Sequence, residues 1–288
     1  MRILITGAAG LLGNELVQSV QAKGWESIAA SRVDWDLAKP EEAAYLIGKY
    51  KPDVTVHCAA ETNVDKCELE PDWAKLINED ATAALAAAIQ AAGSRLVYIS
   101  SCGIFSGDSR VSYLETDIPK PRTIYAASKY HGELRVQETN PDFLVCRVGW
   151  LFGGSLTQKK NFVEARRKEA LTGKPMMSAN DKWGSPTWAK HAADRIVDLI
   201  DISAGGVAHV ANAGVVSRHE YVCGILAALN STATVQAVDS SNFKRAAPVP
   251  DFEAISSVRN KDWGMSPLPS WQEALADYVK IYAAIKTP

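Results

Sequence analysis

The sequence lacks several features that point to particular classes of protein. Its 31 basic and 33 acidic residues nearly cancel, which leaves a formal net charge of −2. Proteins that bind nucleic acid or an anionic membrane surface usually carry a basic excess, so any anionic ligand here must be held by local charge. No run of about 18 apolar residues and no charged leader before Ile3 is present, which argues against membrane spanning and export. We therefore expect a cytoplasmic protein.

Patterns for disulfides and metal ions are also missing. The five cysteines are odd in number, widely spaced and free of Cys-x-x-Cys pairs, and the five histidines form no His-Glu-x-x-His motif. Such spacings mark disulfide frameworks and zinc sites. We expect reduced thiols and no metal, and we interpret His57 and Cys58 as core residues. No long linker rich in Pro, Gly or Ser divides the chain.

The strongest motif that is present is the stretch RILITGAAGLLG at residues 2–13. A short apolar run of β type breaks into glycines spaced three apart and then opens a helix with apolar residues at helical spacing. Such glycines allow a tight turn, close approach to a pyrophosphate and close packing of helix on strand, while the helix N-terminus favours an anion. The alternative is a plain glycine-rich connection. The motif predicts a dinucleotide site formed by Gly7, Gly10, Leu11, Leu12 and Gly13.

Strand-type and helix-type segments then alternate four times. Strands are predicted at 25–30, 53–60 and 95–100, and helices at 40–50 and 72–92, with a loop between 61 and 71. This order predicts a parallel sheet with right-handed crossovers, in which ligands bind at the carboxyl ends of the strands.

The ends of the second and third strands therefore supply further candidates for cofactor contacts. A basic residue at the tip of the second strand accommodates the 2′-phosphate of NADP, whereas an acidic one binds the 2′-hydroxyl of NAD. Ser31 and Arg32 stand there and favour NADPH, although a solvated arginine is an alternative and NADH stays open. We expect Asp36 and Leu37 along the adenine and Ala59 and Ala60 beside the cofactor backbone.

Three residues carry the candidate chemistry. The fourth strand ends in Ser100 and Ser101, and Tyr125 and Lys129 stand four apart on a predicted helix, which places them on one face. A neighbouring lysine cation favours the phenolate, so we expect Lys129 to lower the pKa of Tyr125. Lys129 can also bind the nicotinamide ribose, and Ser101 can hold a substrate oxygen where charge develops. A Tyr-x-x-x-Lys pair alone usually marks an ordinary helix surface, so the interpretation depends on the glycine turn and the serine-ended strand.

The second half predicts a smaller lobe. A fifth strand at 142–147 leads into a loop at 150–154, short strands are expected at 205–210 and 233–238, and helices at 188–200, 217–229 and 271–285. Thr187 is a candidate cap, and 240–260 is a candidate lid. We expect an NAD(P)-binding domain at 1–149 with parts of 188–210, interwoven with a substrate-binding lobe at 150–187 and 205–288. A basic segment is either a diphosphate clamp or a solvated helix face; it contains Lys159, Lys160, Arg166, Arg167 and Lys168.

The motifs TGAAGLLG, SS and YAASK, in this order, resemble the extended short-chain dehydrogenase/reductase superfamily. More narrowly, CAAETNVDKCELEP, SYLETDIPKPRTIYAASKYHGE and RVGWLFGG are similar to dTDP-4-dehydrorhamnose reductases, and further similar pieces extend over nearly the whole chain. The resemblance implies an α/β fold of Rossmann type, a doubly wound parallel sheet with a smaller C-terminal lobe. It implies Ser101, Tyr125 and Lys129 as catalytic residues, and Ser101, Cys102, Trp150 and Asn161 as candidates for substrate contacts.

By this resemblance the chain reduces a 4-keto group on a nucleotide-activated deoxysugar with NAD(P)H, and a homodimer stays open. Two departures affect the substrate-reading positions. The family usually carries Thr-Asp-Tyr where this chain has Ser101-Cys102-Gly103, and Arg-Pro where it has Pro248-Val249-Pro250. Related dehydratases need an added acid and base that Cys102 and Gly103 cannot supply. The alternatives are a catalytically silent regulatory subunit, like the β subunit of methionine adenosyltransferase, and a sugar-nucleotide epimerase that retains NAD.

Overall fold

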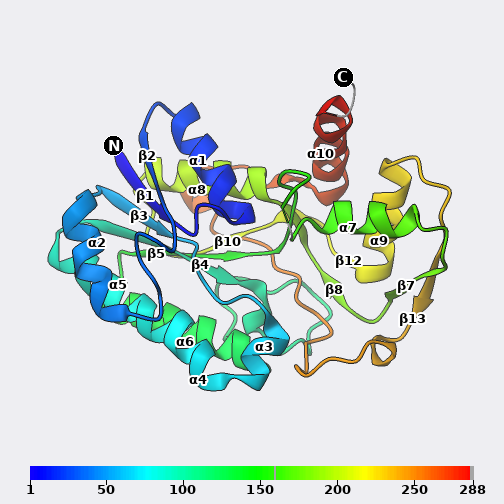
Figure 1. Ribbon diagram of the computed structural model, residues 1–288, viewed down its shortest axis with the longest axis horizontal. Coiled ribbons are helices and arrows are strands. Elements are labelled where there is room, and N and C mark those ends of the chain that lie inside the picture. Colours follow the sequence, from blue (N-terminus) through cyan, green and yellow to red (C-terminus); the bar gives the residue numbers. More distant parts are fainter. Residues whose placement is uncertain (159, 286–288) are drawn as a thin grey trace.

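A six-stranded parallel sheet forms the centre of the molecule (Figure 1). The computed structural model describes residues 1–158 and 160–285. The predicted alternation of strands and helices is confirmed, and the sheet order is β10-β5-β4-β3-β1-β2. The carboxyl ends of β1, β2 and β3 lie level, because Thr6 is opposite both Ala30 and His57. The strands are β1 (Arg2–Thr6), β2 (Glu26–Ala30), β3 (Val54–His57), β4 (Arg95–Ser101), β5 (Leu144–Val148) and β10 (Gly206–Val210).

Helices cover both faces of this sheet, which explains why its strands are almost continuously apolar. Ile3 and Ile5 of β1 pack into the core beneath α1 (Leu11–Ala22) and α8 (Ala189–Asp201), whereas Leu4 packs into the core on the other face. That second face is covered by α2 (Ala43–Tyr50), α5 (Ala81–Ala91) and α6 (Ile124–Thr139) (Figure 1). The carboxyl edge of the sheet is left free for a ligand.

The segment between β3 and α5 differs from the prediction. The expected loop contains a short helix, α3 (Val64–Leu69), whose N-cap residue Asn63 accepts a hydrogen bond from the backbone amide of Lys66. The expected helix at 72–92 starts as α4 (Pro71–Lys75), passes through a π-helical turn at Leu76–Asp80 and continues as α5. The turn holds Asn78 in the interior, where its side chain donates to Ser128 and accepts from the Glu61 amide. A π turn of this kind is frequent where a helix lines a functional site.

The smaller lobe is built from short paired strands and three helices around an aromatic core. Phe152, Trp188, Tyr221, Trp271 and Tyr278 are buried together there. The strand pairs are β6 (Trp150–Phe152) with β9 (Pro186–Trp188), β7 (Met176–Ala179) with β13 (Val235–Val238), β8 (Trp183–Gly184) with β12 (Val216–Ser217), and β11 (Asn212–Ala213) with β14 (Leu268–Ser270). The helices of this lobe are α7 (Phe162–Ala170), α9 (Arg218–Ala228) and α10 (Trp271–Ile285). Short 3₁₀ turns follow β2 and β4 of the central sheet, at Pro40–Glu42 and Cys102–Ile104, and two more lie at Ser240–Asn242 and Lys261–Trp263.

Two expectations for the second half are wrong. The strand at 205–210 was described as part of the smaller lobe, although parts of 188–210 were also assigned to the NAD(P)-binding domain; β10 pairs with β5 and completes the central sheet. Thr187 does not cap α8, because its hydroxyl donates to the Ser185 carbonyl, while the amide of Trp188 is bound by the side chain of Asn212. None of the described helices has the length and apolarity needed to span a bilayer.

Candidate active site

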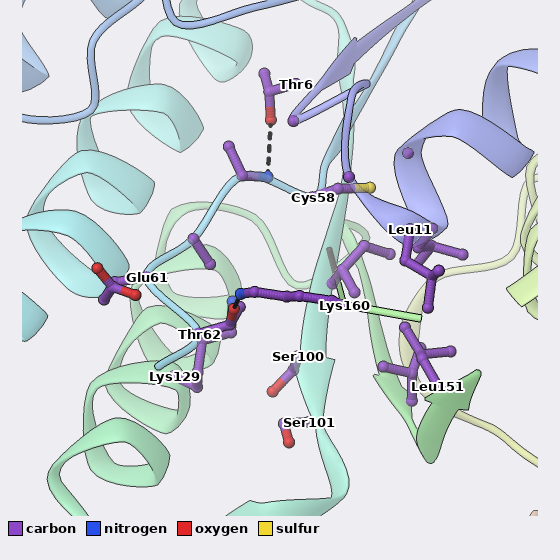
Figure 2. A pocket seen from close by; sticks show the side chains of 18 of the residues that line it. Thr6, Leu11, Cys58, Glu61, Thr62, Ser100, Ser101, Lys129, Leu151 and Lys160 are labelled. Atoms are coloured by element: carbon purple, nitrogen blue, oxygen red, sulfur yellow. Dashed lines mark hydrogen bonds between the residues drawn. The ribbon is translucent and has the colours of Figure 1, made fainter. Parts of the chain in front are cut away.

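A cavity of about 730 Å³ opens where the strands of the sheet end (Figure 2). Ser101, Tyr125 and Lys129 line it, and so does Trp150 at the side of the smaller lobe. Most of the residues predicted to contact the cofactor also lie on its wall, namely Gly7, Gly10, Leu11, Leu12, Gly13, Ser31, Arg32, Leu37, Ala59 and Ala60. The fold thus brings both predicted groups of residues to one continuous space.

The glycine turn leaves no room for side chains. Gly7 has φ of +66°, and a Cβ built on it would lie 2.8 Å from the amide nitrogen of Ala59. A Cβ on Gly13 would lie 2.3 Å from the carbonyl oxygen of Gly7. Helix α1 follows without a side-chain cap, so its N-terminal amides can receive an anion. The turn therefore fits the pyrophosphate of a dinucleotide.

The tip of β2 presents Arg32 to the cavity. The Arg32 side chain is 78% exposed, and its Nε lies 3.9 Å from Asp36 Oδ1. Asp36 does not line the cavity, contrary to the expectation, because its carboxylate turns to Arg32 and accepts from the Ala38 amide. The carboxylate of Asp34 instead binds the amide and hydroxyl of Ser31, which fixes this turn.

Tyr125 and Ser101 meet at the centre of the cavity. Tyr125 lies in the first turn of α6, which is capped by Thr123 through a bond from the Ala126 amide. The side chains of Tyr125 and Ser101 form a hydrogen bond. Ser101 Oγ also accepts from the Gly103 amide over 3.1 Å, which orients it at the end of β4. Lys129 follows one turn later on α6 and points into the same space (Figure 2).

The electrostatics of this pair differ from the expectation. Burial raises the pKa of Tyr125, and the hydrogen bond from Ser101 offsets only part of that rise. Burial likewise lowers the pKa of Lys129 to about 7, against the attraction of Glu133. The ammonium lies 4.1 Å above the ring of Tyr98. Desolvation is therefore the largest cause of the pKa shift of both groups, and the predicted lowering of the Tyr125 pKa by Lys129 is not found.

Two of the expected substrate contacts lie inside the protein instead. Asn161 is 2% exposed, caps α7 by accepting from the Glu164 amide and donates to the Tyr278 hydroxyl over 2.8 Å. Cys102 is buried in an apolar cluster with Phe105. Neither residue lines the cavity, because packing turns their side chains into the core.

Trp150 forms the wall of the cavity beyond Tyr125. Its indole nitrogen donates to Glu253 Oε2 over 2.9 Å, and the guanidinium of Arg218 lies 3.6 Å from the centre of its ring. Arg218 was not singled out from the sequence, although the Ser-x-x-Glu capping pattern at 217–220 places it in the first turn of α9. Other lining residues that were missed are Glu61, Thr62, Trp73, Phe162 and Tyr221.

The predicted basic segment separates into different environments. Lys160 crosses the cavity and donates to the hydroxyl of Thr62 (Figure 2). Arg166 and Lys168 lie on α7 and pair with Glu169 and Glu164, as the solvated helix alternative implies, and Arg167 also pairs with Glu164. Lys159 lies outside the described residues. Within 1–158 and 160–285, no group of three or more His, Cys, Asp or Glu side chains could hold a metal ion.

Comparison with known proteins assigns the family. The family model described as the RmlD substrate binding domain matches residues 1–284. The dTDP-4-dehydrorhamnose reductase of Burkholderia thailandensis is 33% identical over 96% of this chain and 97% of its own length. This chain belongs to the dTDP-4-dehydrorhamnose reductase family.

Two further proteins are similar to nearly the whole of this chain. The spore coat polysaccharide biosynthesis protein SpsK of Bacillus subtilis is 32% identical over 97% of both chains. The crystal structure of the Bacillus anthracis dTDP-4-dehydrorhamnose reductase, a complex with NADP, is 31% identical and superimposes with a TM-score of 0.93 over 97% of this chain and 99% of that one. The fold of this family member is therefore that of a reductase which binds NADP.

Proposed function

We propose that the chain is an NADPH-dependent reductase of the 4-keto group of a nucleotide-activated deoxysugar, the activity that the names of its relatives state for dTDP-4-dehydrorhamnose. One observation carries this proposal. Ser101, Tyr125 and Lys129 line the same cavity as the glycine turn, where the absence of side chains lets a ligand approach the backbone closely. NADPH supplies the hydride when it is bound.

The residues of the chain have separate roles in this proposal. The turn from Gly7 to Gly13 receives the pyrophosphate of the cofactor, and Arg32 receives its ribose phosphate. Ser101 donates a hydrogen bond to the ketone oxygen, which fixes the carbonyl and stabilises the charge that develops on it. Tyr125 donates its phenolic proton to that oxygen as it becomes an alkoxide.

The titration behaviour supports a donor role for Tyr125. Its raised pKa keeps the phenol protonated at neutral pH, which is the form that donates. Lys129, with a pKa of about 7, can exchange protons with water at neutral pH and can bind a ribose hydroxyl in either state. Trp150 supplies the apolar wall of the site in the substrate-binding lobe.

Turnover with dTDP-4-keto-6-deoxysugars and NADPH tests the proposal. We expect NADPH oxidation by the purified protein, and we expect Tyr125→Phe to lower kcat by about 10²-fold or more because it lacks the proton donor. Tyr45→Phe is the matched control, since Tyr45 is 72% exposed on α2. Absence of turnover, or a Tyr125→Phe variant as fast as the control, would refute the proposal. NAD that copurifies with an inactive protein would favour the epimerase alternative.

A further inference from the structure

Arg218 presents a positive charge to the cavity. Its guanidinium lies over two aromatic rings, 3.6 Å from the centre of Trp150 and 5.2 Å from that of Phe162. The charges of Glu253 and Arg245 reach it only through space, and burial lowers its pKa. Among the side chains of residues 1–158 and 160–281, none forms an ion pair with it or accepts a hydrogen bond from its guanidinium. The Arg218 guanidinium stays protonated nevertheless, so an anion bound beside it would be stabilised.

The ring beneath Arg218 is held in place from three directions. Glu253 accepts from the edge of the Trp150 indole. Gly184 packs on the ring, since a Cβ there would lie 2.3 Å from it. The guanidinium covers the ring itself. A guanidinium stacked in this way loses little freedom on binding and keeps its donor edge for a planar or tetrahedral anion.

The other cations around the cavity are already engaged or serve another end. Lys160 donates to the hydroxyl of Thr62, and Lys182, which does not line the cavity, pairs with Asp251. Arg32 lies at the tip of β2, and Lys129 faces the ring of Tyr98. Among the described residues, Lys160 and Arg218 are thus the lining cations that come from segments of the smaller lobe, and Arg218 is the one that stacks on Trp150.

We propose that Arg218 binds the diphosphate of the sugar nucleotide and thereby sets which substrates this chain accepts. The assignment rests on the proposed function, because a keto group beside Tyr125 leaves the rest of the nucleotide to extend toward α9. The glycine turn that we assign to the pyrophosphate of the cofactor lies at the end of β1, whereas Arg218 reaches the cavity from α9, so the two diphosphates have separate sites. Glu253 is a positioning residue in this arrangement, since it acts through Trp150.

The test compares the binding of dTDP, dTMP and thymidine to the NADPH-loaded protein and its Arg218→Gln variant. Charged hydrogen bonds of the bidentate kind are strong, so we expect dTDP to bind the variant about 10-fold to 100-fold more weakly. Binding of thymidine and NADPH should be unchanged, and KM for the keto sugar should rise more than kcat falls. Arg218→Lys should restore only part of the affinity, because lysine cannot bind in a bidentate manner. Arg110→Gln, on an exposed residue, is the matched control.

The outcomes separate this inference from the proposed function. Turnover by the wild type together with a dTDP affinity of Arg218→Gln within twofold of the control overturns the inference alone. Loss of thymidine binding equal to that of dTDP also overturns it, since the contact would then be with the nucleoside. Selective loss of dTDP binding in a protein that turns over no keto sugar supports the inference while the proposed reductase activity fails. NADPH binding and thermal unfolding of each variant establish that it is folded.

Discussion

Exchanging Gly13 for alanine should weaken both the fold and the binding of NADPH. Gly13 lies in the first turn of α1, and a Cβ built on it would lie 2.3 Å from the carbonyl oxygen of Gly7 and 2.8 Å from the Cα of Ala8. Both atoms belong to the backbone of the turn that we assign to the pyrophosphate. The added methyl group can be accommodated only if this turn moves away from the helix.

Two opposing effects determine how much Gly13→Ala changes the free energy of unfolding. Alanine is a better helix former than glycine by about 1 kcal/mol, which favours the variant. Overpacking of a rigid interior costs about 1–3 kcal/mol, and contacts this short with backbone belong at the upper end of that range. We therefore expect the free energy of unfolding to fall by about 1–2 kcal/mol. Gly48 of α2 has nothing within 4 Å of the site of a Cβ, so the same exchange there should raise it by about 0.5–1 kcal/mol.

Urea denaturation and a fluorescence titration with NADPH measure the two effects. Gly13→Ala should bind NADPH at least about 10-fold more weakly, because a displaced turn loses charge-assisted bonds worth about 1.5–3 kcal/mol each. Gly48→Ala should bind it like the wild type. If Gly13→Ala proved as stable as Gly48→Ala and bound NADPH equally well, the assignment of the turn would be wrong.

Two further predictions concern helix α6. Glu133→Gln should lower the free energy of unfolding, measured by urea denaturation, by about 3–5 kcal/mol, because it leaves the buried Arg147, 2.8 Å away, without its counterion. Glu138 lies in an exposed ion pair, so Glu138→Gln should lower the free energy of unfolding by less than about 1 kcal/mol. Equal losses in the two variants would contradict a buried ion pair at Glu133. The pKa of Lys129 near 7 in the folded chain is below its unfolded value of about 10.4, so the unfolded state holds more protons between them and stability should rise with pH. We expect the free energy of unfolding to rise by up to about 2 kcal/mol between pH 7 and 9 and Lys129→Met to abolish most of this slope; equal slopes would refute a neutral, buried Lys129.

The cofactor end of the site was predictable from the sequence because its signals are local. The glycines that shape the turn lie between one strand and the helix that directly follows it, and Tyr125 and Lys129 share one face of a single helix. Parallel strands then bring their carboxyl ends to one edge whatever the rest of the chain does. The positions of Gly7, Ser101 and Tyr125 thus follow from short stretches and one topological rule.

The substrate end was less predictable because it depends on contacts between distant segments. Trp150 meets Glu253 across 103 positions of sequence, and Arg218 reaches the same ring from a third segment. The amide side chain of Asn161 is of a type that often contacts ligands, but here it caps a helix and donates to the Tyr278 hydroxyl. The direction of the Tyr125 pKa shift likewise depends on burial, which spacing along a helix does not reveal.

The position of β10 in the sequence limits how the chain can be truncated into fragments that fold. This strand and α8 lie in sequence between two groups of substrate-lobe segments, yet they complete the sheet that begins with β1. A fragment ending at 149 would leave the edge of β5 unpaired and the apolar face of α1 bare, and such edges promote aggregation. Neither half is a module that could be excised and grafted elsewhere, and cofactor and substrate are held by one cooperative unit.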